Sequence, residues 1–154
     1  MKSVLFVCTA NMCRSPMAEA LFKAVVHARG EEDWRIESAG VAASEGVPAT
    51  ENTRLVAAER GLDLGAHRSK RATRSVIGPF SLVLVMEANH RRELQASMPD
   101  LADRIHLLTG MVGQNSDIWD PVGTDNENYR ALADQIDDIL GRGFARITTL
   151  TGGS

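Results

Sequence analysis

A thiol and a guanidinium lie close together near the start of the chain. Cys8 follows the apolar run at residues 4–7, and Arg14 comes after the five residues 9–13. The backbone N–H groups of so short a loop can curl around one small anion, and a helix that begins at its end adds partial positive charge. Arg14 can bind two oxygens of a tetrahedral anion side by side, which lysine does less well. These residues predict a phosphate site.

The same positive field would stabilise the thiolate of Cys8, which is the reactive form of a cysteine. A thiolate beside a bound phosphoryl group can attack phosphorus, so Cys8 is the candidate nucleophile. The Ser15 hydroxyl can donate a hydrogen bond to the sulfur and help it leave a phosphocysteine later. We expect the phosphate-binding loop to consist of Thr9, Ala10, Asn11, Met12, Cys13 and Ser15.

A second requirement is a proton for the leaving alkoxide or phenoxide, and a carboxylic acid is a natural donor. Asp120 precedes Pro121 in a loop before the last expected helix, and proline favours an extended conformation at the residue before it. We expect Asp120 to be the general acid, with Asp117 as the second candidate. An Asp-Pro pair alone is also typical of an ordinary turn.

The elements that must position these residues follow an alternating pattern of short apolar runs and helical periodicity. Strands are expected at 4–7, 34–38 with a stop at Ala39-Gly40, 82–86 and 105–108, and helices at 15–29, about 50–60, 89–97 and from 126 onward. The alternation predicts an α/β fold with three layers, in which helices cover both faces of a small doubly wound four-stranded parallel sheet. Ligands in such folds bind beyond the carboxyl ends of the strands, where Cys8 is expected.

Two details concern the ends of helices. Ser15 is expected to cap the first helix, with Pro16 at its first position. The last helix carries an apolar face formed by Tyr129, Leu132, Ile136, Ile139 and Leu140. We expect one domain over residues 1–147 and a frayed tail over 148–154.

Composition and charge narrow the class of protein. The chain has 154 residues, of which 44% are apolar, and a net charge of −3, which argues against a general nucleic-acid binder. No apolar run approaches the ~20 residues that span a bilayer, and the N-terminal run is too short for a signal peptide. Two cysteines five positions apart fit a reducing compartment. We expect a cytoplasmic protein with no metal, cofactor, nucleic-acid or membrane partner.

One local exception to the acidic balance is the basic stretch at residues 67–74. It is either a solvated loop or a patch that steers an anionic substrate toward the site.

The chain resembles low-molecular-weight protein tyrosine phosphatases from residue 4 to about residue 129. The matching motifs are Cys-x5-Arg-Ser-Pro at 8–16, Met-Ala-Glu-Ala at 17–20, Ser-Ala-Gly at 38–40, His-Arg-Ser at 67–69, the strand at 82–86 and Asp-Pro at 120–121. Several phosphatase families share the first motif, whereas its N-terminal position combined with a late aspartate is specific to this family. The resemblance implies that Cys8 is the nucleophile, Arg14 the phosphate clamp and Asp120 the general acid.

The resemblance also implies a hydrogen-bond network that holds the loop, made by Asn11, Ser15, Ser38 and His67. It further implies that Cys13 can form a disulfide with Cys8, and we expect mild peroxide to form this bond reversibly.

The chain departs from the family at several positions. Ala10 replaces a usual glycine, and a positive φ there would strain it. Tyrosine-specific members carry aromatic residues at two positions to enclose the phosphotyrosine ring, and this chain has Val122 and the small residues 42–44 there. Trp119, just before Asp120, is either a substitute for these aromatic walls or a packing residue. Met12, Trp119 and Val122 are the expected mouth of the site. At position 12 the bulky apolar Met12 resembles the residue type that tyrosine phosphatases usually carry, whereas members that resemble arginine phosphatases have a small threonine there. Thr9 and the Asp-Pro-x-Gly motif at 120–123, in contrast, resemble the bacterial branch that contains arginine phosphatases.

These observations predict a protein tyrosine phosphatase that forms a phosphocysteine, with phosphorylated proteins as substrates and inorganic phosphate as product or inhibitor. A protein arginine phosphatase on the same site is the alternative. Arsenate reduction needs further thiols after the third strand, and residues 86–89 contain none. A module that binds phosphate without catalysis is a further alternative, and the presence of Cys8 argues against it because binding alone needs no nucleophile.

Overall fold

The computed structural model describes residues 1–152, and its centre is a sheet of four parallel strands. The strands are β1 (Lys2–Cys8), β2 (Trp34–Gly40), β3 (Leu82–Val85) and β4 (Ile105–Leu107), and they lie in the order β2-β1-β3-β4. The chain therefore moves outward from β1 to β2 and then crosses to β3 on the other side. The expected doubly wound parallel sheet is confirmed, and Cys8 lies at the point where the winding direction changes.

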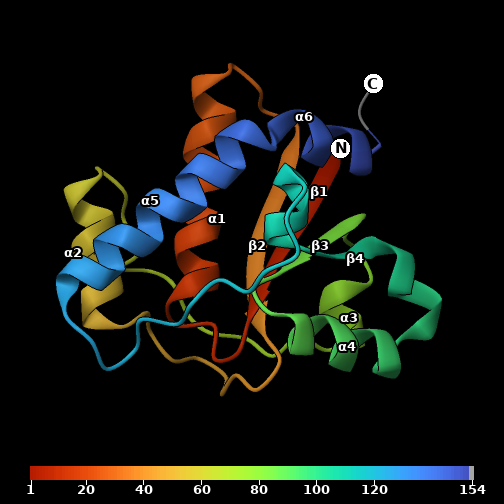
Figure 1. Cartoon of the computed structure of the whole chain (residues 1–154), viewed down its shortest axis with the longest axis horizontal. Helices are drawn as coiled ribbons and strands as arrows, with labels where there is room; N and C mark the ends of the chain where they lie inside the picture. The colour runs from red at the N-terminus through yellow and green to blue at the C-terminus, as the bar shows by residue number, and fades with distance from the viewer. Residues whose placement is uncertain (153–154) are drawn as a thin grey trace.

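Helices cover both faces of this sheet (Figure 1). One face carries α1 (Arg14–Ala28), α2 (Glu51–Glu59), α5 (Asn126–Arg142) and α6 (Phe144–Leu150). The other carries α3 (Arg74–Ile77), α4 (Ala88–Ser97) and the 3-10 helix η1 (Pro99–Arg104). A second 3-10 helix, η2 (Leu108–Val112), follows β4. The three expected layers are thus confirmed.

Alternating side chains of β1 explain why its apolar run is continuous. Val4 and Phe6 pack into the core beneath α1 and α5, whereas Leu5 and Val7 pack into the core beneath α3 and α4. All four side chains are fully buried. A parallel strand covered on both faces has no solvent side, so it needs no polar alternation.

The last two helices confirm one expectation and correct another. The apolar face of α5 is buried as expected, and the Asp125 side chain caps its start by accepting a hydrogen bond from Asn128 N. The tail that was expected to fray from residue 148 instead continues α6 to Leu150. Ile147 and Thr151 are both buried, which holds this end in place, and residues 153–154 lie outside the described part.

The start of α1 also differs from expectation. The helix begins at Arg14, its N-cap is Cys13, and no side chain caps it. Ser15 therefore lies inside the first turn rather than before it, and its hydroxyl is used within the site. The short helices α3, η1 and η2 were not predicted, because segments of this length show too little periodicity. Within residues 1–152, no helix combines the length and apolar content that crossing a bilayer requires.

Candidate active site

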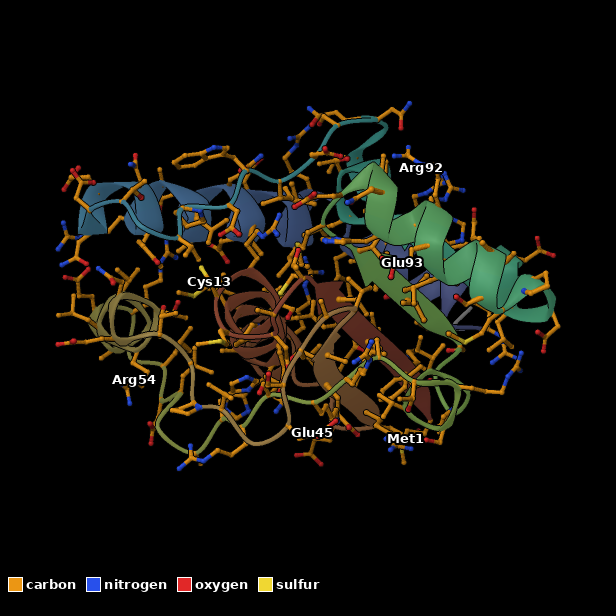
Figure 2. The ribbon with its side chains drawn as sticks, turned by 90° about the horizontal axis from the view of Figure 1, so that it is seen from below. Met1, Cys13, Glu45, Arg54, Arg92 and Glu93 are labelled. Carbon is orange, nitrogen blue, oxygen red and sulfur yellow. The ribbon has the colours of Figure 1, made fainter. Side chains whose placement is uncertain are left out.

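Residues 9–13 form the loop that joins β1 to α1 at the carboxyl edge of the sheet. Figure 2 looks onto this edge, with Cys13 labelled beside the first turn of α1. The two residues that follow β2 hold the start of the loop, because Val41 N and Ala42 N donate hydrogen bonds to the carbonyls of Cys8 and Thr9 at 3.0 and 2.9 Å. The loop is therefore held at both its ends by regular structure.

Asn11 is the centre of the loop's hydrogen-bond network. Its side-chain amide donates to Ser15 Oγ at 2.8 Å and to Ser38 Oγ at 2.9 Å, and its Oδ1 accepts from Lys70 N at 3.0 Å. Its backbone carbonyl lies 2.8 Å from His67 Nε2. The structure thus brings together the four residues expected in the network, and Asn11 touches the other three.

The backbone of Asn11 corrects the expectation of strain at Ala10. Among residues 1–152, Asn11 is the only non-glycine residue with a positive φ, at 57°. Asparagine tolerates this left-handed region better than most residues because its short polar side chain can bond locally. The turn is therefore placed at Asn11, and Ala10 replaces glycine without the strain of a positive φ.

The Cys8 sulfur lies at the floor of the loop, within hydrogen-bond distance of Asn11 N and Ser15 Oγ. Asn11 N donates to Sγ at 3.3 Å, and Ser15 Oγ lies 3.0 Å from it. The sulfur also faces the N-terminus of α1, whose unpaired N–H groups carry partial positive charge.

The buried guanidinium of Arg14 has five N–H groups, and the protein uses three of them. Nη1 donates to Glu87 Oε2 at 2.6 Å and to the Ile118 carbonyl at 2.7 Å, while Nη2 donates to Thr9 Oγ1 at 3.3 Å. The Nε–H and the second Nη2–H remain. Nε and Nη2 are neighbouring nitrogens on one edge of the planar group, and one N–H from each can bind two oxygens of a phosphoryl group.

Asp120 lies beside this edge. Its Oδ2 is 3.6 Å from Arg14 Nη2, and its Oδ1 accepts a hydrogen bond from Val122 N at 3.1 Å, which sets the orientation of the carboxyl group. Asp117, the second candidate acid, instead accepts from Ala88 N at 2.8 Å at the start of α4. Asp117 therefore contacts the start of α4, and it is not among the residues that line the cavity described next.

A cavity of about 110 Å³ opens between these groups. It is lined by Cys8, Ala10, Met12, Cys13, Arg14, Thr50, Asp120 and Val122. The expected mouth residues Met12 and Val122 are among them, whereas Trp119 is not. The Trp119 side chain is 60% exposed, so it is not a core packing residue either. Its neighbour Ile118 points inward and donates its N–H to the Met86 carbonyl, which leaves Trp119 on the outer side.

Four residues of the site were missed from the sequence, and one of them is Thr50, which lines the cavity. The other three are Glu87, which accepts a hydrogen bond from Arg14, His90, whose Nε2 lies 2.8 Å from Thr9 Oγ1, and Glu19, which accepts a hydrogen bond from the Ser38 hydroxyl at 2.7 Å. Glu87 comes two residues after the last residue of β3, so an acidic residue just past the carboxyl end of a buried strand was the available signal. Glu19 and His90 lie on helices, where charged residues are common and carry no such signal.

The basic stretch at residues 67–74 contributes mainly through its backbone and His67. Lys70 pairs with Glu37, and Arg74 pairs with Asp100 through two hydrogen bonds at 2.7 and 2.9 Å. Within residues 1–152, Arg68 and Arg71 of the same stretch form no ion pair, so the pairing of Lys70 and Arg74 leaves both interpretations of the stretch open.

Comparison with known proteins agrees with this geometry. The family described as low molecular weight phosphotyrosine protein phosphatase matches residues 3–149. The chain belongs to this family. Among similar proteins, a protein-arginine-phosphatase of Geobacillus stearothermophilus is 36% identical over 147 residues, which cover 95% of this chain and 96% of that protein.

Two further relatives carry tyrosine phosphatase names. The low molecular weight protein-tyrosine-phosphatase Wzb of Escherichia coli is 32% identical over 130 residues, which cover 84% of each chain. The crystal structure of a low molecular weight protein tyrosine phosphatase from T. tengcongensis matches with a TM-score of 0.89 and 38% identity, and covers 95% of this chain and 99% of that one. The family membership is thus supported by both sequence and fold.

Gly40 lets the end of β2 approach the loop of this phosphatase closely. A Cβ at Gly40 would lie 2.6 Å from the Thr9 carbonyl oxygen and 2.9 Å from Asn11 N. We expect Gly40→Ala to displace the loop, to lower the free energy of unfolding by about 1–3 kcal/mol and to reduce kcat/KM. Gly141→Ala in α5 is the matched control, because a Cβ there meets no atom within 4 Å. Equal melting temperatures and rates for both variants would contradict this prediction.

Cys13 lines the same cavity as Cys8, and both cysteines are free and buried. Burial raises the pKa of Cys13 to about 12, so its thiol is protonated at neutral pH. After peroxide converts Cys8 to a sulfenic acid, the Cys13 thiolate would attack the Cys8 sulfur, so that the S–S bond forms, the S–O bond breaks and hydroxide leaves and takes a proton from solvent. We expect the closure rate to rise with pH, because the thiolate fraction of Cys13 grows toward its raised pKa.

Thiol treatment after peroxide should restore the activity of the parent and leave Cys13→Ser largely inactive. The measurement is phosphatase activity before peroxide, after it and after the thiol. Equal recovery in both proteins would rule out the protective disulfide.

Proposed function

We propose that this chain acts as a single phosphatase domain that hydrolyses phosphotyrosine in proteins through a phosphocysteine at Cys8. The observation that carries the proposal is the convergence of three groups on one cavity. They are the Cys8 sulfur, the edge of Arg14 that keeps two free N–H groups, and the Asp120 carboxyl group. Inorganic phosphate would be the product and a competitive inhibitor.

In the first step, the Cys8 thiolate attacks phosphorus while the loop N–H groups and Arg14 hold the other phosphoryl oxygens. The S–P bond forms, the bond to the leaving oxygen breaks, and that oxygen takes a proton from Asp120. In the second step, Asp120 accepts a proton from water, the water oxygen bonds to phosphorus and the S–P bond breaks. The hydrogen bond from Ser15 stabilises the departing thiolate.

The lining of the mouth supports an aromatic substrate. Met12 and Val122 give the cavity apolar walls, and the Val122 side chain is exposed beside Asp120. A phenyl ring buries apolar area against such walls, whereas a phosphoarginine guanidinium would lose hydrogen bonds to water there. We also propose a cytoplasmic location, which agrees with two free cysteines in the chain.

Protein arginine phosphatase activity is the second candidate, because a relative that matches 95% of this chain is named a protein-arginine-phosphatase. Both activities would use the same sulfur, clamp and acid. They would differ in the groups that surround the atom leaving phosphorus.

A direct comparison of phosphotyrosine and phosphoarginine peptides tests the substrate. We expect kcat/KM to be higher on the phosphotyrosine peptide, and we expect Met12→Thr to lower that preference by roughly tenfold, because it removes apolar wall area. Val122→Thr removes apolar area from the other wall of the cavity, so the same argument expects it to shift the preference in the same direction. A parent enzyme that prefers phosphoarginine would assign the second function.

A further inference from the structure

His90 is a buried imidazole beside the phosphate site that the proposed reaction does not use. It lies on α4 with 1% of its surface exposed. Its Nε2 is 2.8 Å from Thr9 Oγ1, and its Nδ1 has no hydrogen-bond partner within residues 1–152. Burying a ring nitrogen without a hydrogen-bond partner costs free energy. The hydrogen bond between Nε2 and Thr9 Oγ1 is the polar contact that offsets this cost.

The positions of the protons follow from the neighbours of the ring. If Nδ1 carried the proton, a buried N–H group would have no acceptor, whereas a bare Nδ1 leaves only a lone pair unpaired. The favoured form is therefore neutral, with the proton on Nε2 donated to Thr9 Oγ1. Burial lowers the pKa of His90, and the charged groups that face it are Glu87, Arg14, Glu93 and Asp117.

The same Thr9 oxygen accepts a hydrogen bond from Arg14 Nη2 at 3.3 Å. Two lone pairs of one hydroxyl are thus occupied by His90 and Arg14. Without a fixed acceptor at Thr9, the guanidinium would be held only through Nη1, by Glu87 and the Ile118 carbonyl. Nη2 could then turn toward the Asp120 carboxylate, 3.6 Å away, and away from a phosphoryl oxygen.

We propose that His90 is a positioning residue that acts through Thr9 to fix the phosphate-binding edge of Arg14. The proposal rests on the proposed function for the identity of that edge. It assigns to α4 a direct part in phosphate affinity, although no atom of α4 lines the cavity.

A pair of amide variants tests the role of Nε2. The Gln side chain can place its amide nitrogen near the position of Nε2, whereas the shorter Asn side chain cannot reach it. The affinity for inorganic phosphate is measured by calorimetry, and kcat and KM are measured with p-nitrophenyl phosphate. We expect His90→Asn to weaken phosphate binding and to raise KM by roughly tenfold, and His90→Gln to stay within about threefold of the parent.

A double-mutant cycle with Thr9→Val then separates positioning from a purely structural role. Val keeps the shape of Thr9 but removes the shared oxygen. If His90 acts through Thr9, His90→Asn causes no further loss of phosphate affinity in the Thr9→Val background. Additive losses, or a fall in melting temperature with unchanged phosphate affinity, would overturn the proposal. Because phosphate binding needs no turnover, a parent that binds phosphate without hydrolysing esters refutes the proposed function and still tests His90.

Discussion

Cys8→Ser is expected to lose hydrolysis of p-nitrophenyl phosphate by at least about four powers of ten. The Cys8 sulfur lines the cavity, where Asn11 N donates to it at 3.3 Å and Ser15 Oγ lies 3.0 Å away, so it is placed to attack a bound phosphoryl group. A serine hydroxyl at neutral pH is a far weaker nucleophile, and no base within the loop is placed to activate it. The measurement is the steady-state rate with the purified variant.

Calorimetry with inorganic phosphate provides the control for this variant. Arg14 and the loop N–H groups do not depend on the sulfur, so phosphate should still bind to Cys8→Ser. Bound phosphate with no turnover would assign Cys8 to the chemical step. Persistent hydrolysis by the variant would refute the phosphocysteine mechanism.

Asp120→Asn is expected to slow the hydrolysis of phenyl phosphate by roughly two to four powers of ten. An amide can keep the hydrogen bond that Oδ1 accepts from Val122 N, but it cannot protonate the leaving oxygen. The loss should be much smaller with p-nitrophenyl phosphate, because its phenolate leaves readily without a proton. The dependence of the rate on the leaving group therefore identifies the role of Asp120.

Asp117→Asn is the matched control for this experiment. Asp117 lies three positions earlier and accepts from Ala88 N, so its substitution should lower the melting temperature slightly and leave the leaving-group dependence unchanged. If Asp117→Asn and not Asp120→Asn showed the leaving-group effect, the assignment of the acid would be reversed.

The sequence by itself determined those features that depend only on residues close together along the chain. Cys8, the loop and Arg14 lie within seven positions, so their spacing alone predicts an anion site between a strand and a helix. The continuous apolar run before Cys8 likewise predicts a strand buried on both faces, and the sheet confirms this. Local geometry of this kind is set by backbone sterics and hydrogen bonding over a few residues.

Residues close together along the chain did not determine two features: the residue at which α1 begins and the backbone conformation of Ala10. A Ser-Pro pair typically indicates a helix cap, but here the buried Ser15 hydroxyl bonds to Cys8 and Asn11 instead. The competition between a cap and a site contact is decided by partners that the pattern does not contain.

Only the tertiary structure decided how the guanidinium of Arg14 is held. The sheet order β2-β1-β3-β4 places the end of β3 next to the end of β1, which brings Glu87 and His90 beside residues more than 70 positions away. Those contacts leave one edge of Arg14 free, and that edge determines where a phosphoryl group can bind. Such long-range pairings depend on how apolar layers pack, and the packing leaves no mark in the spacing of the residues it joins.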